Sequence, residues 1–127
     1  MQYLDNTISV ERVVFVAVPN PLRTIGEDYM RMIRAPKSVK KRFEGILEHY
    51  MDHRIDDMDI AKAYGAVQVG KLLLLHDKTD TVTRLSAAER ILEHWDNAQL
   101  MVTEGYGHFS LVKNTGVIAR VAAFMNE

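Results

Sequence analysis

The apolar residues of this chain form short continuous runs, separated by longer amphipathic segments. Residues 11–18 read ERVVFVAV and residues 71–76 read KLLLLH, and neither run alternates with polar positions. Such runs are typical of strands that are buried on both faces, as the strands of parallel sheets are. A third run covers residues 98–103. We therefore predict three strands of one parallel sheet.

The segments between and after these runs have helical spacing. Residues 37–51 follow Pro36 and carry apolar side chains three and four positions apart, which predicts a helix with one apolar face. Ser86 and Glu89 match a capping box at the start of a later helix. The full set of predicted helices is residues 26–35, 37–51, 57–67, a helix that opens at Ser86, and residues 117–125. Strands that alternate with helices in this way predict an α/β fold with right-handed crossovers.

The composition narrows the classes of function. The chain has 127 residues, a net charge of -1 and no cysteine. The charge gives no basis for nucleic acid or an anionic membrane as partner, and the absence of cysteine excludes disulfides, thiolate metal sites and a cysteine nucleophile. No apolar run approaches the length of a membrane span, and the first residues lack the pattern of a signal peptide. We expect a cytoplasmic protein without a nucleic-acid or membrane partner.

Two chemically useful side chains follow the second and third predicted strands. Asp80 lies four residues beyond the second strand, and His108 lies five residues beyond the third, flanked by Gly105 and Gly107. Functional groups of parallel α/β sheets gather at these carboxyl ends. A carboxylate beside an imidazole fixes the tautomer of the ring and stabilises the imidazolium form. Because an aspartate in a turn often caps only local backbone N–H groups, spacing alone leaves a structural role for Asp80 open.

The segment from Leu72 to the end of the chain resembles the closing segment of the α/β-hydrolase fold. In that family a G/H-x-x-D turn, followed by a valine and a proline, carries the acid of a Ser-Asp-His triad, and a later G-x-G-H turn carries the histidine. Asp80 and Val82 match the first turn, with Thr83 where proline is common, and the residues around His108 match the second. The resemblance implies that Asp80 is the triad acid and His108 the triad base. Asp77 occupies a position often held by glycine and is a second candidate for the acid.

The resemblance also implies a division of the chain. Residues 1–127 would form a single partial hydrolase domain, in which about residues 20–68 are a helical cap or lid. About residues 69–127 would be the segment that bears the acid and the histidine. The strand at residues 11–18 resembles the one that follows the nucleophile helix in the family.

The family's nucleophile motif is missing from this sequence. None of the serines (Ser9, Ser38, Ser86 and Ser110) lies in G-x-S-x-G, and the order serine, acid, histidine would place the nucleophile before Glu11. We therefore expect the C-terminal part of a serine hydrolase that acts on an ester or related acyl substrate and is inactive alone. A preceding segment or another chain would supply the serine and the oxyanion hole.

Two other interpretations stay open. The chain is either a non-enzymatic domain, whose apolar sheet edge pairs with another chain or with a second copy in a swapped homodimer, or a truncated gene product. No cofactor is expected. His49 and His53 lie one helical turn apart near Asp52, Asp56 and Asp57, a spacing that fits a divalent metal; a solvated helix face is the preferred interpretation, so no metal site is predicted.

Overall fold

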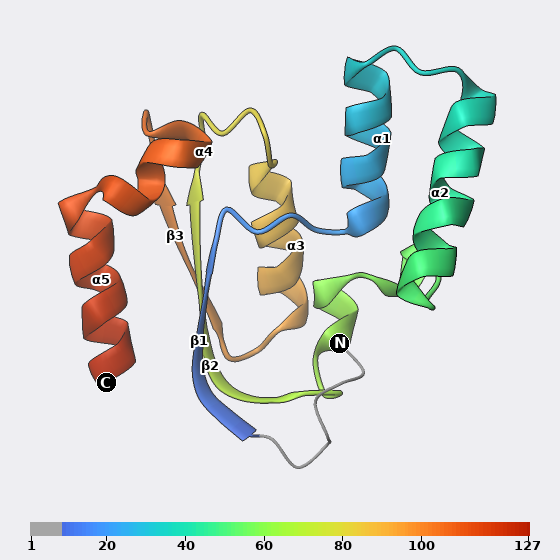
Figure 1. The fold of residues 1–127 in the computed structure, drawn as a ribbon. Helices are drawn as coiled ribbons and strands as arrows, with labels where there is room; N and C mark the ends of the chain where they lie inside the picture. Colours follow the sequence, from blue (N-terminus) through green and yellow to red (C-terminus); the bar gives the residue numbers. More distant parts are fainter. Residues whose placement is uncertain (1–8) are drawn as a thin grey trace.

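The computed structural model describes residues 9–127, which form one α/β arrangement (Figure 1). Its three strands are β1 (Ser9–Val16), β2 (Gln68–Asp77) and β3 (Ala98–Thr103). They are parallel and lie in the order β1-β2-β3, so β2 is central in the described sheet. The predicted fold class, an α/β fold with three parallel strands and flanking helices, is confirmed.

The central strand β2 is buried on both faces, which explains its uninterrupted apolar sequence. Leu72 and Leu74 pack on the face covered by α3 (Leu85–His94), where they contact residues such as Ile91. Leu73 and Leu75 pack on the opposite face, against α5 (Thr115–Asn126) and its buried Phe124. Figure 1 shows α3 and α5 on the two sides of the sheet. Burial of each leucine contributes about 1.5–3 kcal/mol, so these side chains fix the register of both layers.

A helical insertion, residues 17–67, connects β1 to β2. Its main helices are α1 (Leu22–Met32) and α2 (Lys37–Met51), which stand as a hairpin away from the sheet (Figure 1). The helical hairpin is closed at its base within the insertion: the backbone N–H of Leu22 donates to the carbonyl of Met58 at 3.1 Å. Asn20 and Asp59 reinforce this junction, because the Asn20 amide donates to the Asp59 carboxylate at 3.1 Å.

The prediction of a helix at residues 57–67 was wrong. This stretch contains only two short 3₁₀ turns, η1 (Ile55–Asp57) and η2 (Ile60–Ala63). The local backbone N–H groups are taken by side chains: Ile60 N donates to Asn20 Oδ1 at 2.7 Å and Ala61 N to Asp59 Oδ1 at 3.1 Å. Asp59 begins η2 as its N-cap, and the chain reaches β2 within a few residues of its end.

The predicted capping box was also wrong. The helix α3 begins at Leu85 with Arg84 as its N-cap, and no side chain caps it. Ser86 is therefore inside the helix, whereas a capping box requires the serine at the N-cap position. The preceding turn sets this start. The backbone N–H of Thr83 donates to Asp80, so the turn extends to Thr83 and the helix begins after Arg84.

The layers outside the sheet end with α4 (Gly107–Ser110), a 3₁₀ turn, η3 (Leu111–Lys113), and α5. Asn114 caps α5 by accepting a hydrogen bond from Val117 N at 3.0 Å. Within residues 9–127, no helix has the length and apolar character needed to cross a membrane.

Candidate active site

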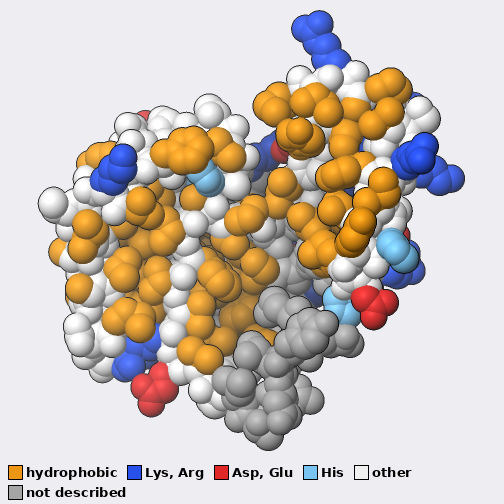
Figure 2. Space-filling model, viewed as in Figure 1, with side chains coloured by type: hydrophobic (Ala, Val, Ile, Leu, Met, Phe, Trp, Pro, Cys, Tyr) orange, Lys and Arg blue, Asp and Glu red, His pale blue; other side chains and the backbone are white. Residues whose placement is uncertain are grey.

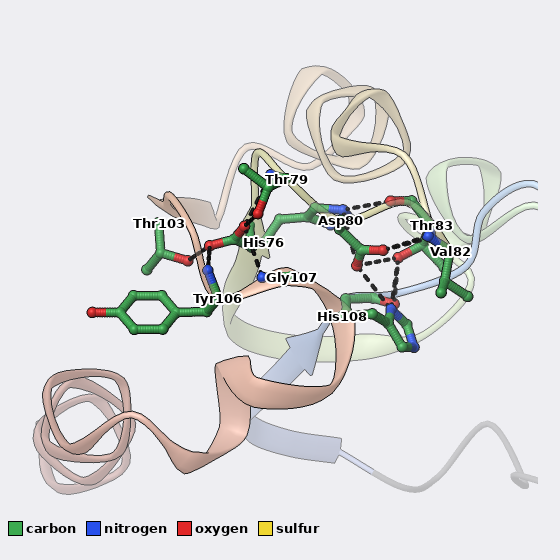
Figure 3. Close-up of polar contacts among 11 residues, drawn as sticks. His76, Thr79, Asp80, Val82, Thr83, Thr103, Tyr106, Gly107 and His108 are labelled. Atoms are coloured by element: carbon green, nitrogen blue, oxygen red, sulfur yellow. Dashed lines mark hydrogen bonds and ion pairs between the residues drawn. The ribbon is translucent and has the colours of Figure 1, made fainter.

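Asp80 and His108 meet at the carboxyl end of the sheet, although 28 positions separate them in sequence. Asp80 lies in the turn after β2, and His108 lies in α4, just after β3 (Figure 3). His108 Nδ1 is 2.8 Å from Asp80 Oδ2. Because a carboxylate only accepts, His108 donates its Nδ1–H to Asp80. The structure thus brings together both residues that the sequence singled out.

The carboxylate of Asp80 is fully enclosed, with a side-chain exposure of 0%. Its Oδ1 accepts from the backbone N–H groups of Val82 and Thr83, both at 2.8 Å. Its Oδ2 accepts from the Thr83 hydroxyl at 2.9 Å and from His108. Burial raises the pKa of Asp80, but these hydrogen bonds lower it by more, so the pKa lies below its ordinary value. The group is a carboxylate at neutral pH and suits an acid that orients a histidine.

The imidazole of His108 has its Nδ1 hydrogen-bonded to Asp80 and its Nε2 directed away from it. Its side chain is 23% exposed. In the neutral ring the Nδ1–H bond to Asp80 leaves Nε2 unprotonated, and Figure 3 shows this second nitrogen on the side away from Asp80. Gly105 and Gly107 have φ values of 92° and 62°, a backbone region that disfavours other residues. The glycines therefore allow the sharp turn that delivers the ring.

Asp77, the second candidate for the triad acid, binds backbone and hydroxyl groups instead. It is the last residue of β2 and is fully buried. Its carboxylate accepts from the N–H groups of Thr79, Tyr106 and Gly107, at 2.9, 3.2 and 3.1 Å. Burial raises the pKa of Asp77, but hydrogen bonds from Thr79, Thr103 and the backbone lower it well below its ordinary value. Within the described residues, its recorded hydrogen bonds include none to the His108 ring.

The family follows from the C-terminal half of the chain. A profile of the family described as TAP-like protein, a group of α/β-hydrolases, matches residues 55–127. This chain belongs to the TAP-like α/β-hydrolases. The match includes β2, β3 and both residues of the Asp80–His108 pair.

Solved structures share the fold of this hydrolase chain. The esterase Pf2001 of Pyrococcus furiosus is similar with a TM-score of 0.61 and 17% identity, over 95% of this chain and 46% of that protein. MGS-M2, an α/β-hydrolase from a deep-sea metagenome library of the Medee basin, is similar with a TM-score of 0.57 and 17% identity, over 92% and 56%. This chain thus spans about half the length of these structures. A comparison with curated proteins finds no match.

Two further residues beside the Asp80–His108 pair were not singled out as site residues from the sequence. The Thr83 hydroxyl lies 2.9 Å from Asp80 Oδ2, 3.2 Å from the carbonyl of Ala17 and 3.4 Å from His108 Nδ1. His76 is fully buried beneath the pair, with Nε2 donating to the carbonyl of Thr83 at 3.2 Å and lying 3.8 Å from Asp80 Oδ2. In the sequence, the available sign of a role for Thr83 was that it stands where proline is common in the family.

Other candidate groups do not join this site. The serines lie in β1, α2, α3 and α4, as Ser9, Ser38, Ser86 and Ser110. His49 is on α2 and His53 follows it, and among residues 9–127 no group of three or more histidines and acids could hold a metal ion. The chemistry that this arrangement can perform is therefore proton transfer at His108 Nε2, assisted by Asp80.

Proposed function

We propose that this chain supplies the acid and the base of a Ser-Asp-His triad to an esterase-like hydrolase. The observation that carries the proposal is the 2.8 Å contact between His108 Nδ1 and the buried Asp80 carboxylate. His108 Nε2 would take the proton of a serine hydroxyl as that oxygen attacks an ester carbonyl, and would then pass it to the departing alcohol. Asp80 would hold the ring in the required tautomer and stabilise the imidazolium form.

The position of the pair indicates where the nucleophile would arrive. The Thr83 hydroxyl contacts the carbonyl of Ala17, just past β1, so the acid turn leans over the end of β1. His108 follows β3 but reaches across the end of β2 to Asp80. A further parallel strand beside β1 would have its carboxyl end on this same edge of the sheet. We propose that this strand precedes β1 in a longer protein or belongs to another chain, and that it carries the serine and the oxyanion hole.

The burial of the strands supports a missing neighbour at β1. None of the eight residues of β1 is buried, although the strand is rich in valine, whereas six of the ten residues of β2 are buried. Figure 2, in the same view as Figure 1, shows hydrophobic side chains gathered over the side of the molecule where β1 lies. An apolar strand at an open edge is prone to pair with another chain. If the missing neighbour carries the serine, the chain by itself should show no esterase activity.

The ester substrate class is proposed from the likeness in fold to the Pyrococcus furiosus esterase and from the chemistry of the pair. An acid–histidine pair activates a hydroxyl for acyl transfer. The helical insertion, which we propose to be the cap over the substrate, stands beside this edge of the sheet. Short p-nitrophenyl esters are suitable first substrates because they do not require a specific cap.

The test uses the native protein from source cells and its variants. We expect a product about twice the 14.5 kDa mass of this chain, because a whole hydrolase domain has that size. In that protein, His108→Ala should lower kcat for p-nitrophenyl acetate by about 10⁶-fold, as loss of a triad histidine does. His94→Ala is the matched control, since His94 is exposed at the end of α3, and it should keep full activity. Full activity in His108→Ala would remove the proposal.

A second candidate function rests on the open edge of β1 alone. If the native product has the mass of this chain, we propose a non-enzymatic domain that pairs β1 with another chain or with a second copy. Sedimentation of the purified chain distinguishes these cases, because strand pairing gives a dimer or a stable complex. A stable, cooperatively folded monomer would contradict this second candidate.

A further inference from the structure

The two carboxylates of the acid turn hold different parts of the histidine turn. Asp80 binds the ring of His108, whereas Asp77 binds the backbone just before it. Asp77 Oδ2 accepts from Tyr106 N at 3.2 Å, and Asp77 Oδ1 accepts from Gly107 N at 3.1 Å. Gly107 is bonded covalently to His108, so these two contacts fix the backbone from which the imidazole projects (Figure 3).

Asp77 is also tied to both strands that lead into the site. It is the register partner of Thr103, and the Thr103 hydroxyl donates to Asp77 Oδ2 at 2.7 Å. The next residue, Lys78, donates its N–H to the carbonyl of Thr103 at 2.9 Å. The carboxylate is fully buried and every recorded contact to it is a donor, so its position is set by the ends of β2 and β3 together. Asp77 thus fixes the backbone of the histidine turn relative to the sheet.

We propose that Asp77 is a positioning residue for His108, which holds the histidine turn so that Asp80 can bind the ring. This inference rests on the proposed function, because it assigns a role in building the same pair. Asp77 does not touch the reacting atoms. It acts through the N–H groups of Tyr106 and Gly107, and without them the turn with its two glycines has freedom to move the ring away from Asp80.

Asp77→Asn is the most direct test. The side chain keeps its size, but one oxygen becomes an NH₂ group, which donates and cannot accept. If the NH₂ replaces Oδ1 it faces Gly107 N–H, and if it replaces Oδ2 it faces Tyr106 N–H. Either orientation removes one backbone hydrogen bond to the histidine turn.

Thr103→Val is the matched control. It removes a hydrogen bond to the same carboxylate but leaves both contacts to the histidine turn in place. A loss of stability alone should appear in both variants. A loss of position at His108 should appear only in Asp77→Asn.

The readout is the tautomer of His108, measured by ¹⁵N NMR of the imidazoles in the full chain, in alkaline buffer. We expect the Nδ1–H tautomer in the wild type and in Thr103→Val, and loss of this predominance in Asp77→Asn, where the ring should average between tautomers. Retention of the wild-type pattern in Asp77→Asn, or its loss in both variants, would overturn the inference. If Asp77→Asn does not fold, Asp77→Gly takes its place, because it removes both acceptor oxygens, and the same two results support or overturn the inference.

The outcomes separate this inference from the proposed function. A wild type without the Nδ1–H tautomer at His108 would contradict the Asp80–His108 pair itself, and with it both proposals. A wild type with this tautomer that persists in Asp77→Asn would overturn only the role of Asp77.

Discussion

Replacing Thr83 by valine tests the hydrogen bonding around the acid. The Thr83 hydroxyl has a single proton and lies 2.9 Å from Asp80 Oδ2 and 3.2 Å from the carbonyl of Ala17. The carboxylate is closer and charged, so we assign the proton to Asp80. Valine has nearly the same shape but offers no donor, and the buried Oδ2 then keeps only its bond from His108.

The expected magnitude follows from the charge of the acceptor. A hydrogen bond to a charged group contributes about 1.5–3 kcal/mol. Unfolding of 127 residues has an entropy of about 270 cal/mol/K at roughly 2.1 cal/mol/K per residue. Dividing the two gives a fall in Tm of about 6–11 °C for Thr83→Val.

The assay is thermal unfolding followed by calorimetry, with Thr81→Val as the control. Thr81 lies in the same turn but is exposed, so its replacement should change stability by less than about 0.5 kcal/mol. A Tm for Thr83→Val that equals that of Thr81→Val would refute the reasoning, because the hydroxyl would then contribute nothing to holding Asp80.

Three other perturbations probe the core, the insertion and the acids. Phe124→Ala should lower the free energy of unfolding in urea by about 3–5 kcal/mol, since Phe124 is fully buried beneath the sheet. Met125 is exposed, so Met125→Ala should lower this free energy by less than about 0.5 kcal/mol, and equal losses would contradict the packing. Asp59→Ala leaves the Asn20 amide without its acceptor and should lower the free energy of unfolding by about 1–3 kcal/mol, with faster proteolysis of the helical insertion. An unchanged rate of cleavage would contradict a stabilising role of the Asn20–Asp59 contact. Asp77 and Asp80 have folded pKa values below the ordinary 3.8, so their contribution is complete above that pH and is lost as the pH falls through the folded values. The urea midpoint should thus decrease below about pH 4, and a midpoint that rises there would contradict the assignment.

The sheet was predictable from sequence because β2 is buried on both faces. Four consecutive leucines leave no polar face, which is typical of a strand at the centre of a layered α/β structure. The predicted third strand coincides with β3, and the second lies within β2. The observed β1 runs from Ser9 to Val16, two residues earlier than predicted, because Ala17 leaves the strand with a positive φ of 49°.

The predictions that were wrong concern segments whose structure depends on contacts between residues far apart in the sequence. The stretch around Ile60 and Ala61 has helical spacing, but Asn20 binds one of its N–H groups from about 40 positions away, and no local pattern encodes that bond. The start of α3 is likewise set by the Asp80 turn and not by Ser86. For the site, the sequence predicted that Asp80 and His108 would lie together, and they do; their catalytic roles remain predictions. The contact of Asp77 with the histidine turn was invisible because its donors are backbone groups.

The closure of the helical insertion between Leu22 and Met58 makes the segment between these residues a replaceable module. The chain leaves the sheet at the carboxyl end of β1, closes on itself where Leu22 N is bonded to the carbonyl of Met58, and then runs to the amino end of β2. Whatever lies between these points can lengthen, shorten or be exchanged while β1 and β2 keep their register, since doubling a loop costs only about 0.6 kcal/mol in closure entropy. A lineage can therefore change what covers the site without rebuilding Asp80 and His108. For the engineer, the same junction marks where a foreign lid could be grafted.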